Sequence, residues 1–262
     1  MPTWNAEQYL KFGDERAQPC RDLIARIALS DPRTIVDLGS GPGNSAAMIA
    51  ERWPGAEITG IDNSEEMIQT AQKAYPARQW VREDISSWAA KTDGEWDLVF
   101  TNASLQWVPD HARVFPQLLA RVSPGGAFAV QMPSNLDEPA MWIPREMAAS
   151  ERWRRWFPKG FVDNWSVHGL PFYYDALAPL AARLELWQTR YFHIFADAGA
   201  IVEWYKGSGL RPFLDAIQQP RDREKFVSEY LEGLREHYGP QRDGKVLFPF
   251  RRIFLIAYRP AR

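Results

Sequence analysis

The pattern in this chain that is best suited to binding a small molecule is an aspartate followed by alternating glycines, Asp37, Gly39, Gly41 and Gly43, with Ser40 among them. Because glycine has no Cβ, the backbone there can adopt positive φ angles and lie against a ligand. The spacing differs from the G-x-G-x-x-G pattern that binds dinucleotides. A carboxylate at Asp37 would repel a diphosphate, whereas it would attract an ammonium group. A purely structural turn is the alternative interpretation.

Further polar residues stand directly after later apolar runs: Asp62 with Asn63, Asp84 with Ile85, and Asn102. The carboxyl ends of parallel strands meet at one edge of a sheet, which is where open α/β sheets bind ligands. There Asp62 would accept the ribose hydroxyls, and Asp84 with the Ile85 amide would contact adenine; a helix cap is the alternative for Asp84. S-adenosylmethionine carries adenosine, a sulfonium and an ammonium group without phosphate, so we expect it as the cofactor.

Only parallel strands joined by helices would bring these residues to one edge of a sheet. The hydrophobic periodicity predicts that strands and helices alternate along the chain in this way. We expect strands at 35–38, 56–62, 78–82, 96–101, 126–132, 184–195 and 246–258. We expect helices at 46–52, 65–75, 142–157, 175–183, 200–207, 212–217 and 221–238, and a loop from Gly160 to the helix that begins at Asp175. The order predicts an α/β fold with a mostly parallel sheet and helices on both faces.

Several segments together resemble the class I S-adenosylmethionine-dependent methyltransferases. The segments are 37–43 (DLGSGPG), 60–67 (GIDNSEEM), 83–84 (ED), 97–100 (DLVF) and 123–128 (SPGGAF), and they come in that family's order over residues 33 to 132. The resemblance implies a Rossmann-like, seven-stranded sheet whose last strand is antiparallel. It also implies cofactor contacts from Asp37, Gly39, Ser40, Gly41, Asp62, Asn63, Asp84, Ile85 and Asn102.

The likeness extends beyond this core, and along the whole chain it resembles the family of trans-aconitate 2-methyltransferases. The segments that carry it are 102–111 (NASLQWVPDH), 131–133 (QMP), 173–175 (YYD), 209–212 (GLRP) and the N-terminal pattern from Trp4 to Arg16. It implies methyl transfer to one carboxylate of trans-aconitate, giving a monomethyl ester. Three alternatives stay open: methylation of another small acid or of a carboxylate on an acyl carrier, a non-catalytic module that binds S-adenosylmethionine, and an NAD oxidoreductase.

The proposed chemistry needs no general base, because the carboxylates of a polycarboxylic acid are ionised at neutral pH. The protein must position the reacting oxygen and neutralise the other carboxylates. As substrate-binding residues we name Tyr173, Tyr174, Arg211, Arg252, His168 and Trp142, with Trp107 and Tyr174 as positioning residues. Tyr9 and Arg16, seven positions apart on an expected helix, would face the methionine end of the cofactor together with Trp107. For each arginine a solvated surface position is the alternative, and for Tyr9 and Tyr174 packing is.

The length of 262 residues predicts one catalytic domain. Its core would comprise about 30–133, 175–196 and 245–260, preceded by an N-terminal helical segment, 1–29. Insertions at 134–174 and 197–244 would form a helical cap, which with the N-terminal residues would act as a lid over the strand ends.

Composition excludes several classes of protein. The net charge of −2 gives no basic surface for nucleic acid, and no apolar run reaches the roughly 20 residues that span a bilayer. One cysteine, Cys20, permits no disulfide framework, and the first residues do not resemble a secretory signal, so we expect a cytoplasmic location. The four histidines have no metal-ligand spacing, so we expect no metal. The sequence does not determine the oligomeric state.

Overall fold

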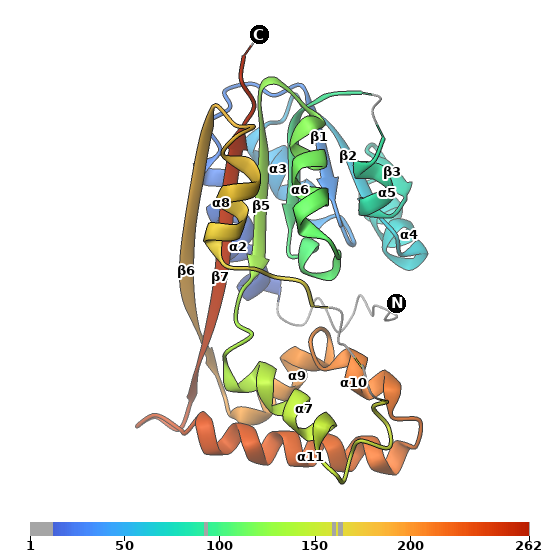
Figure 1. Ribbon diagram of the computed structural model, residues 1–262, viewed down its shortest axis with the longest axis vertical. Coiled ribbons are helices and arrows are strands. Elements are labelled where there is room, and N and C mark those ends of the chain that lie inside the picture. Colours follow the sequence, from blue (N-terminus) through green and yellow to red (C-terminus); the bar gives the residue numbers. More distant parts are fainter. Residues whose placement is uncertain (1–12, 92–93, 159–160, 162–164, 262) are drawn as a thin grey trace. The chain divides into compact units, whose positions relative to one another are not determined.

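A computed structural model describes residues 13–91, 94–158, 161 and 165–261 (Figure 1). Within these ranges the chain forms two compact units. We call the first the sheet unit; it comprises Gly13–Ser134 with the described parts of 164–189 and 252–262. We call the second the helical unit; it comprises the described part of 135–163 with Arg190–Arg251.

The sheet has seven strands in the order β3-β2-β1-β4-β5-β7-β6. Neighbouring strands run parallel from β3 to β5, and β7 runs antiparallel to β5. Their bounds are β1 Thr34–Leu38, β2 Glu57–Asp62, β3 Gln79–Arg82, β4 Trp96–Asn102, β5 Val122–Pro133, β6 Arg183–Phe195 and β7 Val246–Tyr258. The central strands are apolar and buried because helices cover both faces. The predicted seven-stranded, mostly parallel α/β fold is confirmed.

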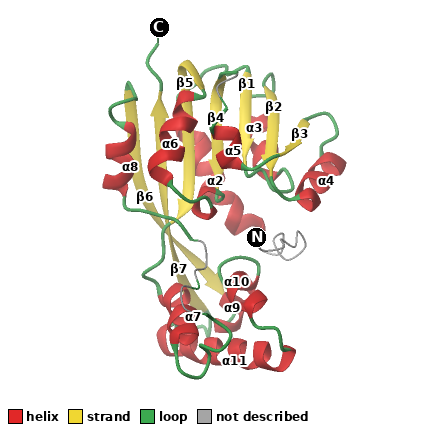
Figure 2. Cartoon of the chain, turned by 45° about the vertical axis from the view of Figure 1, so that its right-hand side comes forward, coloured by secondary structure: helices red, strands yellow, loops and turns green. Residues whose placement is uncertain are grey.

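Helices of the sheet unit lie on both sides of the sheet, with α6 and α8 on one face and α2 and α3 on the other (Figure 2). The bounds are α2 Gly13–Arg26, α3 Asn44–Arg52, α4 Glu65–Ala74, α5 Ile85–Ala89, α6 His111–Ala120 and α8 Leu170–Leu177. Side chains of α5, α6 and α8 form one buried cluster with β1, β4, β5 and β7. This packing holds the carboxyl ends of the parallel strands at a common edge.

The first insertion differs from its prediction at α8. Gly169 and Pro171 were interpreted as loop residues, but Gly169 is the N-cap of α8 and Pro171 occupies its first turn. Proline is favoured at that position because its missing N–H has no helical partner there in any case. Since Tyr173 and Leu177 of α8 are fully buried in the core cluster, this helix belongs to the sheet unit, not to the predicted cap.

Other boundaries also shift. The helix expected at 175–183 ends at Leu177, and the one expected at 142–157 is α7, Pro139–Ala149. Residues 190–195 and 245–251, predicted as core, belong to the helical unit, whereas α2 belongs to the sheet unit. The helices predicted for the second insertion are present as α9 Ala198–Lys206, α10 Arg211–Ala216 and α11 Pro220–His237.

The helical unit is stabilised by buried tyrosines and by rings that pack against one another. The Tyr230 hydroxyl donates to the Ala140 carbonyl at 2.7 Å, and Asn135 Nδ2 donates to the Tyr205 hydroxyl at 2.7 Å. The ring centroids of Phe157, Phe213 and Phe226 lie within 6.2 Å of one another. Such contacts give the unit its own apolar core.

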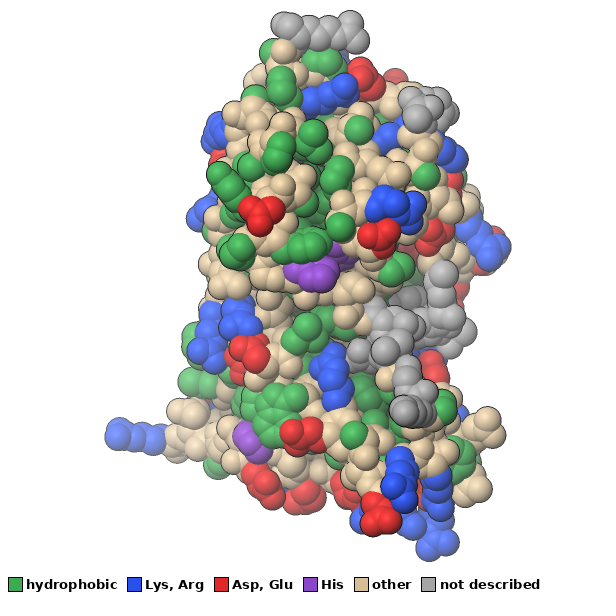
Figure 3. Space-filling model, viewed as in Figure 1, with side chains coloured by type: hydrophobic (Ala, Val, Ile, Leu, Met, Phe, Trp, Pro, Cys, Tyr) green, Lys and Arg blue, Asp and Glu red, His purple; other side chains and the backbone are tan. Residues whose placement is uncertain are grey.

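No helix within the described ranges is both long and apolar enough to cross a membrane. Basic and acidic side chains are interspersed on the face seen in Figure 3. A mixed surface of this kind produces no strong field of one sign over that face.

Candidate functional site

The glycine loop, residues 39–43, has the conformation that its sequence predicts. Gly39, Gly41 and Gly43 have φ angles of 69°, 54° and 94°. A Cβ on Gly39 would lie 2.2 Å from Ser104 Cβ, so this position also requires the absence of a side chain. The Gly39 and Ser40 amides donate to the Ile61 carbonyl at 2.7 and 3.0 Å, which ties the loop to the end of β2.

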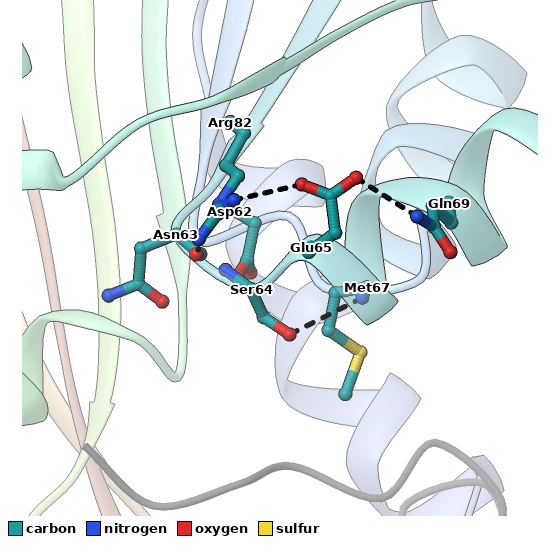
Figure 4. Close-up of polar contacts among 7 residues, drawn as sticks. All are labelled: Asp62, Asn63, Ser64, Glu65, Met67, Gln69 and Arg82. Carbon is teal, nitrogen blue, oxygen red and sulfur yellow. Dashed lines mark hydrogen bonds and ion pairs between the residues drawn. The ribbon is translucent and has the colours of Figure 1, made fainter.

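Asp62 stands at the end of β2, beside Asn63, Ser64 and the start of α4 (Figure 4). Its Oδ2 accepts from the Gly41 amide and its Oδ1 from the Ser64 amide, both at 2.9 Å. Burial raises the pKa of this carboxyl, and the backbone N–H bonds oppose that rise. Arg82 of β3 pairs with Glu65 at 3.0 Å and donates to the Asn63 carbonyl, which braces the turn that carries Asp62.

Asp37 is fully buried behind the glycine loop. The Ser45 hydroxyl donates to its Oδ2 at 2.5 Å. Burial raises the pKa of Asp37 to about 7, the Ser45 bond opposes this rise, and the neighbouring Asp62 carboxyl adds to it. Within the described chain, Asp37 Oδ1 and the Ser40 hydroxyl are buried without a hydrogen-bond partner. Polar atoms of this kind are costly unless something binds them.

Asp84 and Ile85 lie at the next strand end. The Asp84 side chain accepts from the Ser87 amide at 3.1 Å, so it does cap α5, as the alternative interpretation held. Ile85 Cδ1 lies 3.6 Å from the position that a Gly39 Cβ would occupy. The structure therefore brings the predicted cofactor residues from β1, β2 and the end of β3 to one edge of the sheet unit.

A second loop, residues 103–110, follows β4 at the same edge, and we call it the β4 loop. Ser104 Oγ donates to the Leu38 carbonyl at 2.9 Å and lies 2.5 Å from Thr101 Oγ1. Asn102, which precedes the loop, has a buried Oδ1 without a partner within the described chain. Trp107 packs edge-on against Trp165 at 5.0 Å. Sequence reasoning named Asn102 and Trp107 but missed Ser104, because its contact with β1 is not local.

His111 and Tyr173 join the β4 loop to α6 and α8. His111 is buried, with Nε2 at 2.9 Å from the Leu105 carbonyl and Nδ1 at 2.9 Å from the Tyr173 hydroxyl. The same hydroxyl accepts from the His168 amide at 3.1 Å. Burial lowers the pKa of His111, with a smaller contribution from His168, while the Leu105 bond and Asp110 raise it. Tyr173 is fully buried.

Arg252 of β7 is buried, in contrast to the surface position considered from the sequence. Its Nη1 donates to Oε1 of Gln131, a fully buried residue of β5, at 3.2 Å. Gln131 stands in register with Asn102 of β4, and its Nε2 is buried without a partner within the described ranges. Sequence reasoning did not assign Gln131 a role.

The other predicted substrate residues are distributed over both units. In the sheet unit, His168 stacks on Phe172 at 4.0 Å, and Tyr174 is 54% exposed. In the helical unit, Arg211 pairs with Asp215 at 3.1 Å, and Trp142 contacts His237 edge-on at 5.1 Å.

Two predicted cofactor residues, Tyr9 and Arg16, fall at the start of the chain. Tyr9 lies outside the described residues, as does the Arg16 side chain, although the Arg16 backbone is part of α2. The described side chains contain no group of three His, Cys, Asp or Glu residues that could hold a metal ion.

Comparison with known proteins identifies the family. Residues 12–182 match the methyltransferase domain family. The trans-aconitate 2-methyltransferase of Azoarcus sp. strain BH72 is 46% identical over 99% of this chain and 100% of its own length. That of Variovorax paradoxus strain S110 is 42% identical over the full length of both chains.

The chain belongs to the trans-aconitate 2-methyltransferase family. This confirms the resemblance drawn from the motifs. The YcgJ protein of Bacillus subtilis has the same fold, with a TM-score of 0.61 at 13% identity over 94% of this chain and 99% of that protein. The methyltransferase domain match ends at residue 182, whereas the match with the trans-aconitate 2-methyltransferase of Azoarcus sp. also covers Arg190–Arg251 of the helical unit.

Proposed function

We infer that this chain transfers a methyl group from S-adenosylmethionine to one carboxylate of trans-aconitate and forms a monomethyl ester. The observation that carries the inference is the full-length identity of 46% with a trans-aconitate 2-methyltransferase. Since that match covers both units, we propose that they serve one catalytic activity.

The polar groups at the sheet edge fit this cofactor. Asp37 Oδ1 and Asn102 Oδ1 are buried acceptors without partners within the described chain, and an ammonium group supplies the donors they lack. The Asp62 carboxylate holds two backbone N–H groups and keeps lone pairs for ribose hydroxyls. Asp84 and Ile85 would contact adenine. The Asp37 carboxyl and the glycine spacing disfavour a diphosphate, which supports S-adenosylmethionine over NAD.

Bound S-adenosylmethionine supplies an electrophilic methyl group on its sulfonium. The substrate carboxylate is already ionised at neutral pH, so the protein has no proton to remove from the nucleophile. Its residues must orient the reacting oxygen, exclude water and pair the remaining carboxylates with cations. Because Asp37 and Asp62 are acids, we propose Arg252 and Arg211 as the cations for this pairing, and Trp107 and Tyr174 as positioning residues.

Methyl transfer to a panel of di- and tricarboxylates, measured with labelled S-adenosylmethionine, tests the proposal. Trans-aconitate should give the highest kcat/KM. Turnover only on another small acid, or on a carboxylate attached to an acyl carrier, would favour the other carboxylate methyltransferases considered above. Cofactor binding without turnover of any acid would favour a non-catalytic module.

Arg211 offers a matched comparison for the anion-binding role. Arg211 and Arg235 both pair with an acid on their own helix, at 3.1 and 2.7 Å. Arg211→Ala should raise KM for trans-aconitate strongly with cofactor affinity nearly unchanged, and Arg211→Lys should weaken substrate use because lysine lacks the planar fork. Arg235→Ala should leave both constants unchanged. Normal kinetics in the Arg211 variants would make it a surface charge.

We also propose that the protein works in the cytoplasm. Cys20 is its one cysteine, is buried, and has a pKa raised by that burial. A thiol in this state is an inert packing group. Fractionation of cells that express the protein, with antibody detection, tests the location.

A further inference from the structure

The β4 loop begins and ends with strained residues. Ala103 and Asp110 have φ angles of 54° and 57°, and neither is a glycine. Residues with a Cβ seldom adopt this region, and they keep it only where surrounding contacts impose it. The loop therefore depends on contacts with other parts of the sheet unit.

Two sets of contacts hold the loop. At its start, Ser104 donates to the Leu38 carbonyl beside the glycine loop. At its middle, His111 bonds the Leu105 carbonyl, and the Ser166 amide donates to the Gln106 carbonyl at 2.7 Å. The first set joins the loop to β1, and the second joins it to α6 and to the segment before α8.

The partners of His111 determine where its proton lies. The Leu105 carbonyl can only accept, so Nε2 carries the hydrogen. In the neutral ring Nδ1 then accepts, and the Tyr173 hydroxyl must donate to it. The hydroxyl oxygen remains able to accept from the His168 amide. The three hydrogen bonds therefore form one chain in which each group donates to the next, from the His168 amide to Tyr173, His111 and the Leu105 carbonyl. Every buried polar atom in this chain has a partner.

We propose that His111 and Tyr173 are positioning residues that clamp the β4 loop in the geometry required for methyl transfer. Neither touches a ligand in this role. They act through the loop that carries Trp107 and follows Asn102. The proposal rests on the proposed function, and it replaces the substrate contact that the sequence suggested for Tyr173.

Tyr173→Phe tests the clamp, because it removes the hydroxyl and keeps the ring that packs in the core. Tyr258→Phe is the matched control: the Tyr258 hydroxyl also accepts a backbone N–H of the sheet unit, from Ala28 at 2.9 Å, but Tyr258 is not part of the clamp. Hydrogen exchange followed by mass spectrometry should show faster exchange over residues 103–110 in Tyr173→Phe and not in Tyr258→Phe. Equal exchange in the two variants would overturn the proposal.

Kinetics provide the second readout. Tyr173→Phe should lower kcat about tenfold or more, since small errors of position carry a large cost in rate, while the Kd of S-adenosylhomocysteine changes by less than about threefold. Tyr258→Phe should keep the wild-type kcat. His111→Gln, which retains an amide N–H for the Leu105 carbonyl, should be more active than His111→Ala. A kcat in Tyr173→Phe equal to that of the control contradicts a positioning role.

The third readout does not depend on turnover. In ¹⁵N-histidine-labelled protein, the signal that His111→Ala removes should be that of a neutral ring protonated on Nε2 at pH 7. A cation or an Nδ1–H ring at this position would overturn the proposal. If the wild-type protein fails to methylate trans-aconitate, the proposed function is wrong, and the exchange and histidine measurements then decide the clamp.

Discussion

The glycine loop and the β4 loop lie at the same edge of the sheet unit, and both use positive φ angles. In the glycine loop these angles fall on Gly39, Gly41 and Gly43, for which they carry no steric penalty. In the β4 loop they fall on Ala103 and Asp110. Contacts with distant residues impose the positive φ angles of the β4 loop. The glycine loop is also bonded to Ile61 and Asp62, but its residue types alone permit its positive φ angles.

The two loops at this edge of the sheet are encoded in different ways. A glycine turn is encoded by adjacent residues, and its main need is space for the backbone. A strained loop is encoded by tertiary contacts, here those of Ser104 within the loop and of His111 and Tyr173 beside it. Changes in the first should act through backbone conformation, and changes in the second through lost tertiary contacts.

The largest effect is expected where the two loops touch. In Gly39→Ala the φ angle of 69° would be strained and the new Cβ would lie 2.2 Å from Ser104 Cβ. We expect the free energy of unfolding to fall by about 2–5 kcal/mol and cofactor binding to be lost. Gly41→Ala has φ at 54° but no atom within 4 Å, so strain alone should cost about 1–2 kcal/mol. Urea denaturation measures the free energy of unfolding of each variant, and calorimetry measures its cofactor binding. Equal losses would show that the close approach of the loops is unimportant.

Asp37 should make the stability of the ligand-free protein depend on pH. Its pKa rises from 3.8 to about 7 on burial, so the folded state binds this proton more tightly than the unfolded state. The resulting stabilisation is complete below pH 4 and is lost as pH rises to about 7, with a total on the order of 4 kcal/mol. Asp37→Asn should remove this dependence. An unfolding free energy whose pH profile is the same in both proteins would contradict the prediction.

Asp62→Ala should weaken S-adenosylmethionine binding by about 1.5–3 kcal/mol, because a hydrogen bond to a charged group is lost. It also removes the acceptor of the Gly41 and Ser64 amides. Glu66→Ala is the control, since Glu66 is an exposed acid of the following helix, α4, and takes no part in the turn that carries Asp62. Calorimetry should detect no NAD binding in the wild-type protein. Unchanged affinity in Asp62→Ala would exclude the ribose contact.

The smallest effect is expected at Ala103. Ala103→Gly relieves a strained φ of 54° but increases the entropy of the unfolded chain, so stability should rise by about 1 kcal/mol or less. Ala74→Gly, at the end of helix α4, relieves no strain and should lose about 0.5–1 kcal/mol. Thermal and urea denaturation compare the two. A loss in Ala103→Gly as large as that in Ala74→Gly would show that Ala103 stores no strain.

Local patterns were sufficient to place much of the edge to which we assign the cofactor. Asp37, the glycines and Asp62 each lie at a strand end that hydrophobic periodicity predicts, and parallel strands necessarily bring such ends together. The same logic predicted the sheet and the helices of the second insertion. It failed at Gly169 and Pro171, since these residues favour both loops and helix starts, and only the packing of α8 distinguishes the two.

What the sequence by itself determined is therefore the fold and the edge where β1, β2 and β3 end, because those depend on residue type and spacing within short segments. Only the tertiary structure decided that Tyr173 bonds His111, 62 positions away, and that Arg252 bonds Gln131, 121 positions away. Such pairs leave no periodic signal. From its type alone, each of these residues could lie on the surface, in the core or in a binding site. Its burial and its bonding partner in the folded protein decide which of these positions it has.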